Sequence, residues 1–155
     1  MSWLFPWTTS VSTPLGHVVL TGQSGVQSVA FADQPVDGDD PLGAGEAVRR
    51  YFAGELRALD AIPLQLAGTP YQQRVWALVR AIGPGDARSY GDLAVELGSV
   101  ARAVGRANAT NPAALFVPCH RVVGSAGELT GYFWGLDRKR WLLEHESREL
   151  ELFLR

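Results

Sequence analysis

The sequence contains one cysteine, Cys119, and only three histidines, His17, His120 and His145. A single cysteine excludes an internal disulfide and fits a reducing compartment. These four residues show none of the paired spacings that are typical of zinc sites. We therefore expect neither a metal nor another bound cofactor.

Long apolar runs are also missing. No stretch approaches the length that a membrane-spanning helix needs, and residues 1–7 carry no basic region ahead of their apolar side chains, unlike a secretory signal. Lysine is nearly absent, because Lys139 is the only one among 14 basic residues. Together with the abundance of alanine and glycine, this suggests GC-rich bacterial coding and a protein of the bacterial cytoplasm, without membrane contact.

The net charge of −2 is unevenly distributed. Residues 1–73 carry three arginines against seven acidic residues, a net charge of −4, whereas residues 74–140 carry nine basic against five acidic residues, a net charge of +4. Any polyanionic partner is therefore expected to bind the second half of the chain. Ordinary scatter of surface charge explains the pattern about equally well.

Residues 1–67 predict a small domain of strands and one helix. Two short strands are expected over 17–21 and 26–32, and apolar residues at helical spacing predict a helix over 45–59. Residues 62–66 predict a third strand, placed at a sheet edge because it contains a proline. No motif with chemical function occurs in this region.

Residues 68–155 predict a second, mainly helical domain, which makes the fold class α+β with the small domain packed on the helical one. A helix over 70–82 is expected to begin at Thr69 as N-cap. A last helix is expected over 136–145, followed by a polar tail of undefined structure.

Between the helices over 70–82 and 136–145, Ser89 caps a predicted short helix over 90–97 that ends at Gly98. A second helix over 100–109 stops before Asn111 and Pro112. Two short helices joined by a tight turn that contains glycine are typical of a helix-turn-helix.

The second of these helices combines small residues with two arginines. Arg102 and Arg106 lie four residues apart and share a face, while Ala101, Ala103 and Gly105 lack bulk. Such a helix can approach a phosphate backbone closely, and contacts of that kind fix position rather than sequence. Taken alone, the pattern favours the alternative of a tightly packed internal helix with two solvated arginines.

The hexapeptide PCHRVV, residues 118–123, contains the only cysteine beside a histidine. A thiol acts as a nucleophile in its thiolate form, so a neighbouring imidazole held by a carboxylate would activate it. A buried structural cysteine is the alternative.

In their order along the chain, these segments resemble the O6-alkylguanine-DNA alkyltransferases, also called methylated-DNA–protein-cysteine methyltransferases. About 80 residues carry the resemblance strongly, and the front region is similar but less specific. The matching segments are TPYQQRVW (69–76), SYGDLA (89–94), ARAVGRAN (101–108), NP (111–112), PCHRVV (118–123), GY (131–132) and LDRKRWLL (136–143).

The resemblance implies a monomeric DNA repair protein that acts once. It would bind double-stranded DNA through the minor groove, largely independently of sequence, and flip an alkylated guanine out of the stack. The alkyl group would move from guanine O6, and from O4 of alkylthymine, to Cys119. His120 would act as base through a bridging water, because neighbours on a strand point to opposite faces. Glu146 would hold the imidazole as in a triad, with Glu144 as the alternative.

Further roles are implied for residues outside the hexapeptide. Tyr90 would donate its hydroxyl to the flipped guanine, Asn111 would brace the active-site turn and the thiolate, and Arg102 would fill the gap left in the stack. The implied DNA-binding surface consists of Ala101, Arg102, Ala103, Gly105, Arg106 and Tyr90, and the implied substrate pocket of Val122, Tyr132, Phe133 and Trp134.

Two departures from the family pattern affect these roles. The turn at 98–100 is about two residues shorter than in many members, which makes the placement of Arg102 less secure. Phe133 and Trp134 stand where small residues are usual. If their side chains face the pocket, large O6 substituents fit poorly, so we expect methyl to be accepted readily and benzyl poorly.

Three other functions compete. A binding-only relative would lack the cysteine. A cysteine hydrolase would need a remote histidine and asparagine, and neither His17 nor His145 lies in such a setting. A transcription regulator would need polar side chains that read bases, but alanine and glycine predominate in the predicted helix over 100–109.

Overall fold

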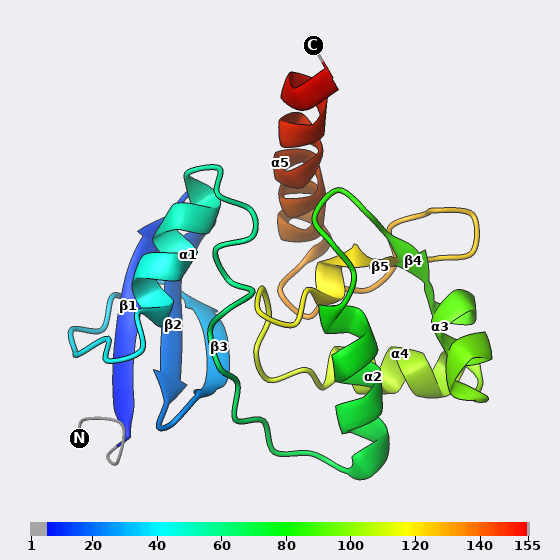
Figure 1. The fold of residues 1–155 in the computed structure, drawn as a ribbon, viewed down its shortest axis with the longest axis horizontal. Coiled ribbons are helices and arrows are strands. Elements are labelled where there is room, and N and C mark those ends of the chain that lie inside the picture. The colour runs from blue at the N-terminus through cyan, green and yellow to red at the C-terminus, as the bar shows by residue number, and fades with distance from the viewer. Residues whose placement is uncertain (1–5, 155) are drawn as a thin grey trace. The chain divides into compact units, whose positions relative to one another are not determined.

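The computed structural model describes residues 6–154, with side chains described for residues 6–147. The chain forms two compact units (Figure 1). One comprises the chain up to Ala67 together with Pro112–Phe116, and the other comprises Gly68–Asn111 and the chain from Val117 onward. A three-stranded sheet in one unit and mainly helices in the other confirm the α+β class. The linear division into domains at 1–67 and 68–155 stays a prediction. It did not anticipate that Pro112–Phe116 belong to the first unit.

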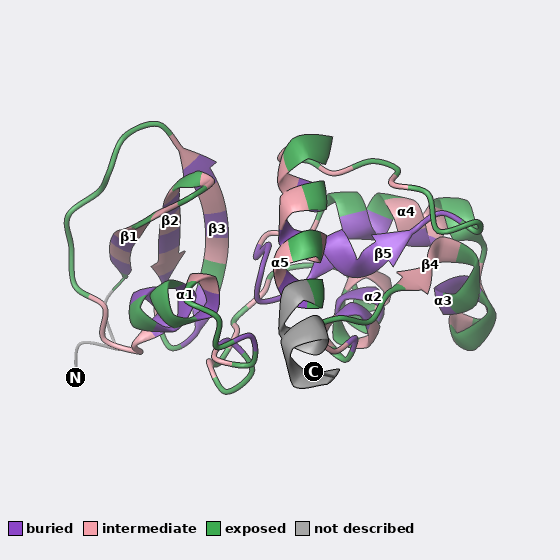
Figure 2. Ribbon diagram, turned by 90° about the horizontal axis from the view of Figure 1, so that it is seen from above, coloured by how far each residue is buried: buried purple, intermediate pink, exposed green. Residues whose placement is uncertain are grey.

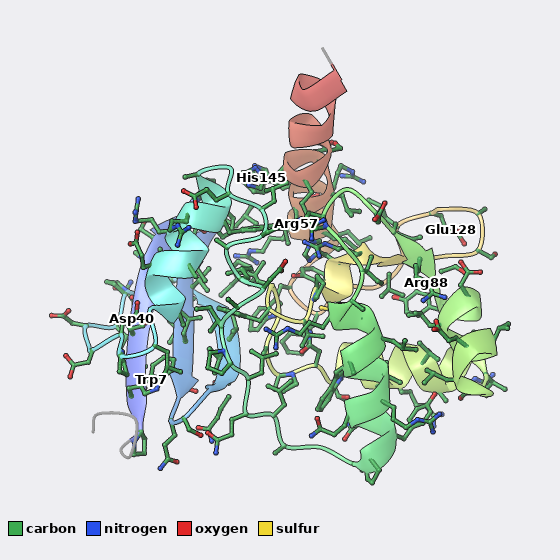
Figure 3. The ribbon with its side chains drawn as sticks, in the orientation of Figure 1. Trp7, Asp40, Arg57, Arg88, Glu128 and His145 are labelled. Carbon is green, nitrogen blue, oxygen red and sulfur yellow. The ribbon has the colours of Figure 1, made fainter. Side chains whose placement is uncertain are left out.

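The first unit is an antiparallel sheet with one helix. Strands β1 (Trp7–Thr13), β2 (Gly16–Gly22) and β3 (Val26–Ala32) pair in that order, and the helix is α1 (Ala44–Phe52). Alternation along β2 buries one set of side chains. The carboxylate of Asp40, labelled in Figure 3, accepts two backbone N–H groups at the start of α1. This unit contains none of the predicted site residues.

Three expectations for this unit were wrong. Strand β1 was not predicted, although its β-branched residues fit a pleated sheet. The helix ends at Phe52 rather than at residue 59, because Gly54 adopts φ +113° just beyond it. Residues 62–66 form only one bridge, between Leu64 and Val26, and Pro63 has no N–H with which to extend the ladder.

In the second unit, two predicted caps form as expected. Helix α2 (Pro70–Arg80) begins with a capping box at Thr69, and α3 (Tyr90–Leu97) begins with one at Ser89. Gly98 ends α3 at φ +63°, and α4 (Ala101–Ala109) begins after two intervening residues, 99 and 100. Helices α3 and α4 are therefore joined by a three-residue turn, and α2 packs against both of them.

A short strand pair joins these helices to the cysteine segment. Strand β4 (Arg88–Ser89) pairs in parallel with β5 (Val122–Val123), and Arg88, labelled in Figure 3, donates to Glu96 at 2.6 Å. Figure 2 shows β5 as a buried element among more exposed helices.

Two expectations for this part of the chain were also wrong. Cys119–Arg121 form a 3-10 helix instead of a strand. The last helix, α5, spans Leu136–Leu154, so that Glu146 lies within it rather than in a polar tail. No helix in the described part of the chain combines the length and the apolar character needed to cross a membrane.

Candidate active site

The 3-10 helix places three consecutive polar side chains in the interior. Cys119 is 8% exposed, and His120 and Arg121 are also buried. The turn is held by two backbone hydrogen bonds, from Cys119 N–H to the Val117 carbonyl at 2.7 Å and from Arg121 N–H to the Pro118 carbonyl at 2.9 Å. The thiol therefore lies in a rigid, largely desolvated segment.

His120 binds Glu146. The distance from His120 Nε2 to Glu146 Oε2 is 2.8 Å, and both side chains are almost fully buried. Burial alone would raise the pKa of Glu146, but its contacts with His120 and Arg121 lower that pKa far below its ordinary value. An ionised carboxylate only accepts hydrogen bonds, so Nε2 carries the proton and Nδ1 carries the free lone pair. The alternative residue, Glu144, is exposed.

Arg121 binds the same carboxylate. It donates from Nε to Oε1 at 2.9 Å and from Nη2 to Oε2 at 2.8 Å, and its Nη1 donates to the Ile82 carbonyl at 2.5 Å. Such a bidentate pair is strong and geometrically specific. Arg121 therefore fixes the carboxylate that faces His120.

Opposing influences act on the pKa of the Cys119 thiol. Burial raises this pKa, while a hydrogen bond from Asn111 and the positive charge of Lys139 lower it. Asn111 also donates through Nδ2 to the Val117 carbonyl at 2.8 Å. Burial lowers the pKa of His120, because it disfavours the charged imidazolium. At rest, the site therefore favours a neutral thiol beside a neutral imidazole.

Lys139 is fully buried on α5. Its ammonium donates to the carbonyls of Val122, Thr130 and Gly131 at 2.7, 2.8 and 3.2 Å. Burial lowers the pKa of Lys139 to about 8, and the charge of Cys119 acts in the opposite direction. One lysine thus ties β5 to the loop that follows and places a positive charge near the sulfur.

The four residues of the implied pocket have different environments. Val122 is fully buried, and the hydroxyl of Tyr132 is buried with a pKa raised well above its ordinary value by burial and by the charge of Cys119. Trp134 is half-buried, whereas Phe133 is 76% exposed and so is not enclosed by the protein. The expectation that benzyl is accepted poorly now rests on Trp134 and stays a prediction.

Helix α4 has an inward and an outward face. Val104, Ala107 and Asn108 are buried, whereas Arg102 and Arg106 are exposed. Ala101 is exposed, and Ala103 and Gly105 are half-buried. The small residues and both arginines of the implied DNA-binding surface are therefore accessible, which does not agree with a helix packed on all sides.

Tyr90 connects this helix to the loop. Its ring atoms lie 3.9 and 4.0 Å from where a Cβ on Gly105 would stand. Its hydroxyl points to the Thr130 carbonyl over a long contact of 3.5 Å. Tyr90 therefore lies between the outward face of α4 and the segment that Lys139 holds.

Comparison with known proteins identifies the family. The sequence profile of the DNA-binding domain of 6-O-methylguanine DNA methyltransferase matches residues 70–148. A methylated-DNA–protein-cysteine methyltransferase from Mycolicibacterium paratuberculosis is 44% identical over 151 residues, covering 90% of this chain and 91% of the relative. The chain belongs to the methylated-DNA–protein-cysteine methyltransferase family.

Solved structures of family members share the fold. A crystal structure of the O6-methylguanine methyltransferase of Mycobacterium tuberculosis shares 38% sequence identity with this chain. The match covers 96% of this chain and 99% of that protein, with a TM-score of 0.80. A crystal structure of Mycobacterium tuberculosis OGT in complex with DNA is 41% identical, with coverages of 91% and 93% and a TM-score of 0.81. The resemblance read from the sequence is thereby confirmed at the level of family and fold.

The sequence did not reveal three residues of the candidate active site. They are Arg121, Lys139 and Asn108, which donates through Nδ2 to the Cys119 carbonyl at 3.4 Å. Arg121 and Lys139 stand inside matched segments, and Lys139 is unusual as the only lysine.

Three buried polar atoms have no hydrogen-bond partner among the described residues: Asn108 Oδ1, His120 Nδ1 and Tyr132 Oη. Buried polar atoms of this kind are usually satisfied by water or ligand.

Proposed function

We propose that this protein repairs DNA by moving an alkyl group from O6 of guanine, and from O4 of thymine, to the sulfur of Cys119. The observation that carries the proposal is the 2.8 Å hydrogen bond between His120 Nε2 and Glu146 Oε2, directly beside the only cysteine. It leaves the basic Nδ1 of His120 available for a proton. Membership of a family whose relatives are named for methylated DNA and protein cysteine supports the same reaction.

The chemistry balances without a cofactor. The thiol proton of Cys119 passes to His120 Nδ1, through a bridging water, and the resulting thiolate attacks the alkyl carbon. A carbon–sulfur bond forms as the carbon–O6 bond breaks, and its electron pair stays with the guanine. The guanine takes up a proton from the Tyr90 hydroxyl, and the proton held by His120 is released to water, from which Tyr90 is protonated again. The products are an S-alkyl cysteine and guanine. A thioether is not readily hydrolysed, so each molecule acts once.

The charge on sulfur needs stabilisation in this desolvated segment. Asn111 and Lys139 both lower the pKa of the Cys119 thiol, so we assign them the role of stabilising the thiolate. Glu146 holds the imidazole and balances its charge once it is protonated. The desolvation that raises the thiol pKa at rest also protects a nucleophile that can be used only once.

Access to the sulfur requires that the base leave the helix. Cys119 is only 8% exposed, so its sulfur cannot reach an atom within a base stack. We propose that α4 enters the minor groove, with Arg102 taking the place of the flipped base and Arg106 contacting phosphate. Tyr90 would donate its hydroxyl to the departing guanine. The protein would act as a monomer, in the cytoplasm where the bacterial chromosome lies.

Intact-mass spectrometry tests the proposal. Mixing the protein with duplex DNA that contains O6-methylguanine should add about 14 Da, a methyl group in place of hydrogen, and peptide mapping should locate it on Cys119. The matched control, Cys119→Ser, should bind the same duplex without gaining mass, because a serine hydroxyl is a weak nucleophile at neutral pH. Loss of the lesion with recovery of unmodified protein would refute the proposal.

A further inference from the structure

The loop between Gly131 and Gly135 presents an aromatic ring to solvent. Phe133 is 76% exposed, and its ring packs edge-to-face on Trp134 with centroids 4.7 Å apart at 83°. The half-buried Trp134 fixes the orientation of a ring that the protein does not cover. A single exposed apolar side chain is ordinary in itself, so the position and the support of this ring decide what it can contact.

The loop that carries Phe133 is held in place at both ends. Lys139 Nζ binds the carbonyls of Thr130 and Gly131, and Gly135 N–H donates to the Tyr132 carbonyl at 3.0 Å. Arg138 further donates to the Trp134 carbonyl at 3.0 Å. Because its supports are buried or hydrogen-bonded, the ring is preorganised, and little conformational entropy would be lost when it binds.

The same loop adjoins both the sulfur and helix α4. The residue before Phe133 is Tyr132, whose buried hydroxyl senses the charge of Cys119. At the start of the loop, the Thr130 carbonyl faces the hydroxyl of Tyr90, whose ring lies against Gly105 on α4. Through Tyr90, the loop that carries the exposed ring is therefore linked to the helix on which Arg102 and Arg106 are exposed.

We propose that Phe133 stacks on a nucleobase of the duplex next to the flipped nucleotide and thereby positions the DNA over Cys119. This inference rests on the proposed function, since it assumes that α4 binds DNA. The face of any nucleobase accepts an aromatic ring, so the contact adds affinity without reading sequence. Extrusion of one base unstacks its neighbours, which exposes a base face of the required shape and polarity.

The test compares Phe133→Ala with Phe133→Trp and Phe133→Tyr. Binding to a duplex with O6-methylguanine is measured by fluorescence anisotropy in the Cys119→Ser background, and transfer is measured as a single-turnover rate in the Cys119 background. Loss of one stacking contact should weaken duplex binding by about 5- to 150-fold in Phe133→Ala. The two aromatic substitutions should restore it. Val36→Ala, another exposed apolar residue, should bind like the parent.

Alkylation of Cys119 by free O6-methylguanine separates this role from others, because no duplex is present. Phe133 is 76% exposed and is not enclosed by the protein, so Phe133→Ala should leave that rate unchanged. A faster rate with unchanged duplex binding would overturn the proposal and make Phe133 a gate of the pocket. Equal loss in both assays would mean structural damage, and self-association abolished by Phe133→Ala would mean that a second copy covers the ring. The binding assay does not need transfer, so it still reports on Phe133 if the proposed reaction fails.

Discussion

Lys139 and Glu146 lie seven residues apart on α5, and both are fully buried on one face with Leu142 between them. The cation binds the carbonyls of the segment after Cys119, and the anion binds His120 and Arg121. Because one helix carries both groups, the spacing between the Lys139 ammonium and the Glu146 carboxylate is set by α5.

Arg121→Met should destabilise the second unit. Removing the guanidinium takes away both of its hydrogen bonds to the buried Glu146 carboxylate, while the bond to His120 at 2.8 Å remains. Breaking one side of a buried ion pair typically costs about 3–5 kcal/mol. Urea denaturation followed by circular dichroism should show this loss. Arg57→Met removes an exposed pair with Asp60 and should leave the midpoint nearly unchanged.

A second variant, Arg121→Lys, separates folding from chemistry. If Arg121→Lys restores stability without restoring the transfer rate, Arg121 orients Glu146 through its bidentate geometry, which a lysine cannot reproduce. A stability of Arg121→Met equal to that of the parent protein would contradict the ion-pair argument.

Sequence reasoning succeeded where local chemistry decides the structure. Ser89 and Gly98 were predicted to bound the short helix, and α3 begins and ends there. These signals act within one turn of helix: a side chain caps a backbone N–H, and glycine adopts positive φ. The start of α4 could likewise be placed to within one residue.

Sequence reasoning failed where tertiary contacts decide. The stripe Lys139, Leu142 and Glu146 has helical spacing, but two of its members are charged, so an apolar pattern does not reveal it. For the same reason α5 was expected to end at residue 145. Arg121 appeared as part of a motif without a role, because its partner Glu146 stands 25 residues away. The pairing becomes visible only when α5 packs against the 3-10 helix.

The transfer rate should depend on pH in a way that reflects Lys139. Because burial lowers the pKa of His120, the imidazole stays neutral in more acidic solution than an ordinary histidine does, so the rate should persist in mild acid and fall only once His120 is protonated. Above a pH of about 8, Lys139 loses its proton and its stabilising charge, so the rate should decline. Quenched-flow measurement of alkylated Cys119 across this range gives the profile.

Lys139→Met provides the control for that profile. It should transfer slowly at every pH and show no decline near pH 8, since no ammonium remains to titrate. A parent rate that keeps rising from pH 7 to pH 10 would contradict the assignment, because it would mean that thiol ionisation alone limits the reaction.

Asn111→Ala should slow transfer by raising the pKa of the Cys119 thiol further. The variant loses the hydrogen bond that lowers this pKa and also the bond to the Val117 carbonyl at 2.8 Å. Hydrogen bonds to charged groups contribute about 1.5–3 kcal/mol, so the rate should fall about 10- to 150-fold. Iodoacetamide alkylation as a function of pH measures the thiol directly. An unchanged alkylation profile would remove Asn111 from the thiolate site.

Arg102→Ala should impair reaction with duplex DNA but not with a free base. Arg102 is exposed on α4, away from the buried contacts of Cys119, so its loss should leave the thiol environment intact. Replacing the stacking contacts of an extruded base is worth a few kcal/mol, and transfer from duplex O6-methylguanine should fall accordingly. Alkylation by free O6-methylguanine should proceed at the parent rate. Arg57→Ala removes an equal charge from the first unit and controls for general electrostatic attraction. Equal losses in the duplex and free-base assays would show that Arg102 acts on the site itself and not on the flipped state of the DNA.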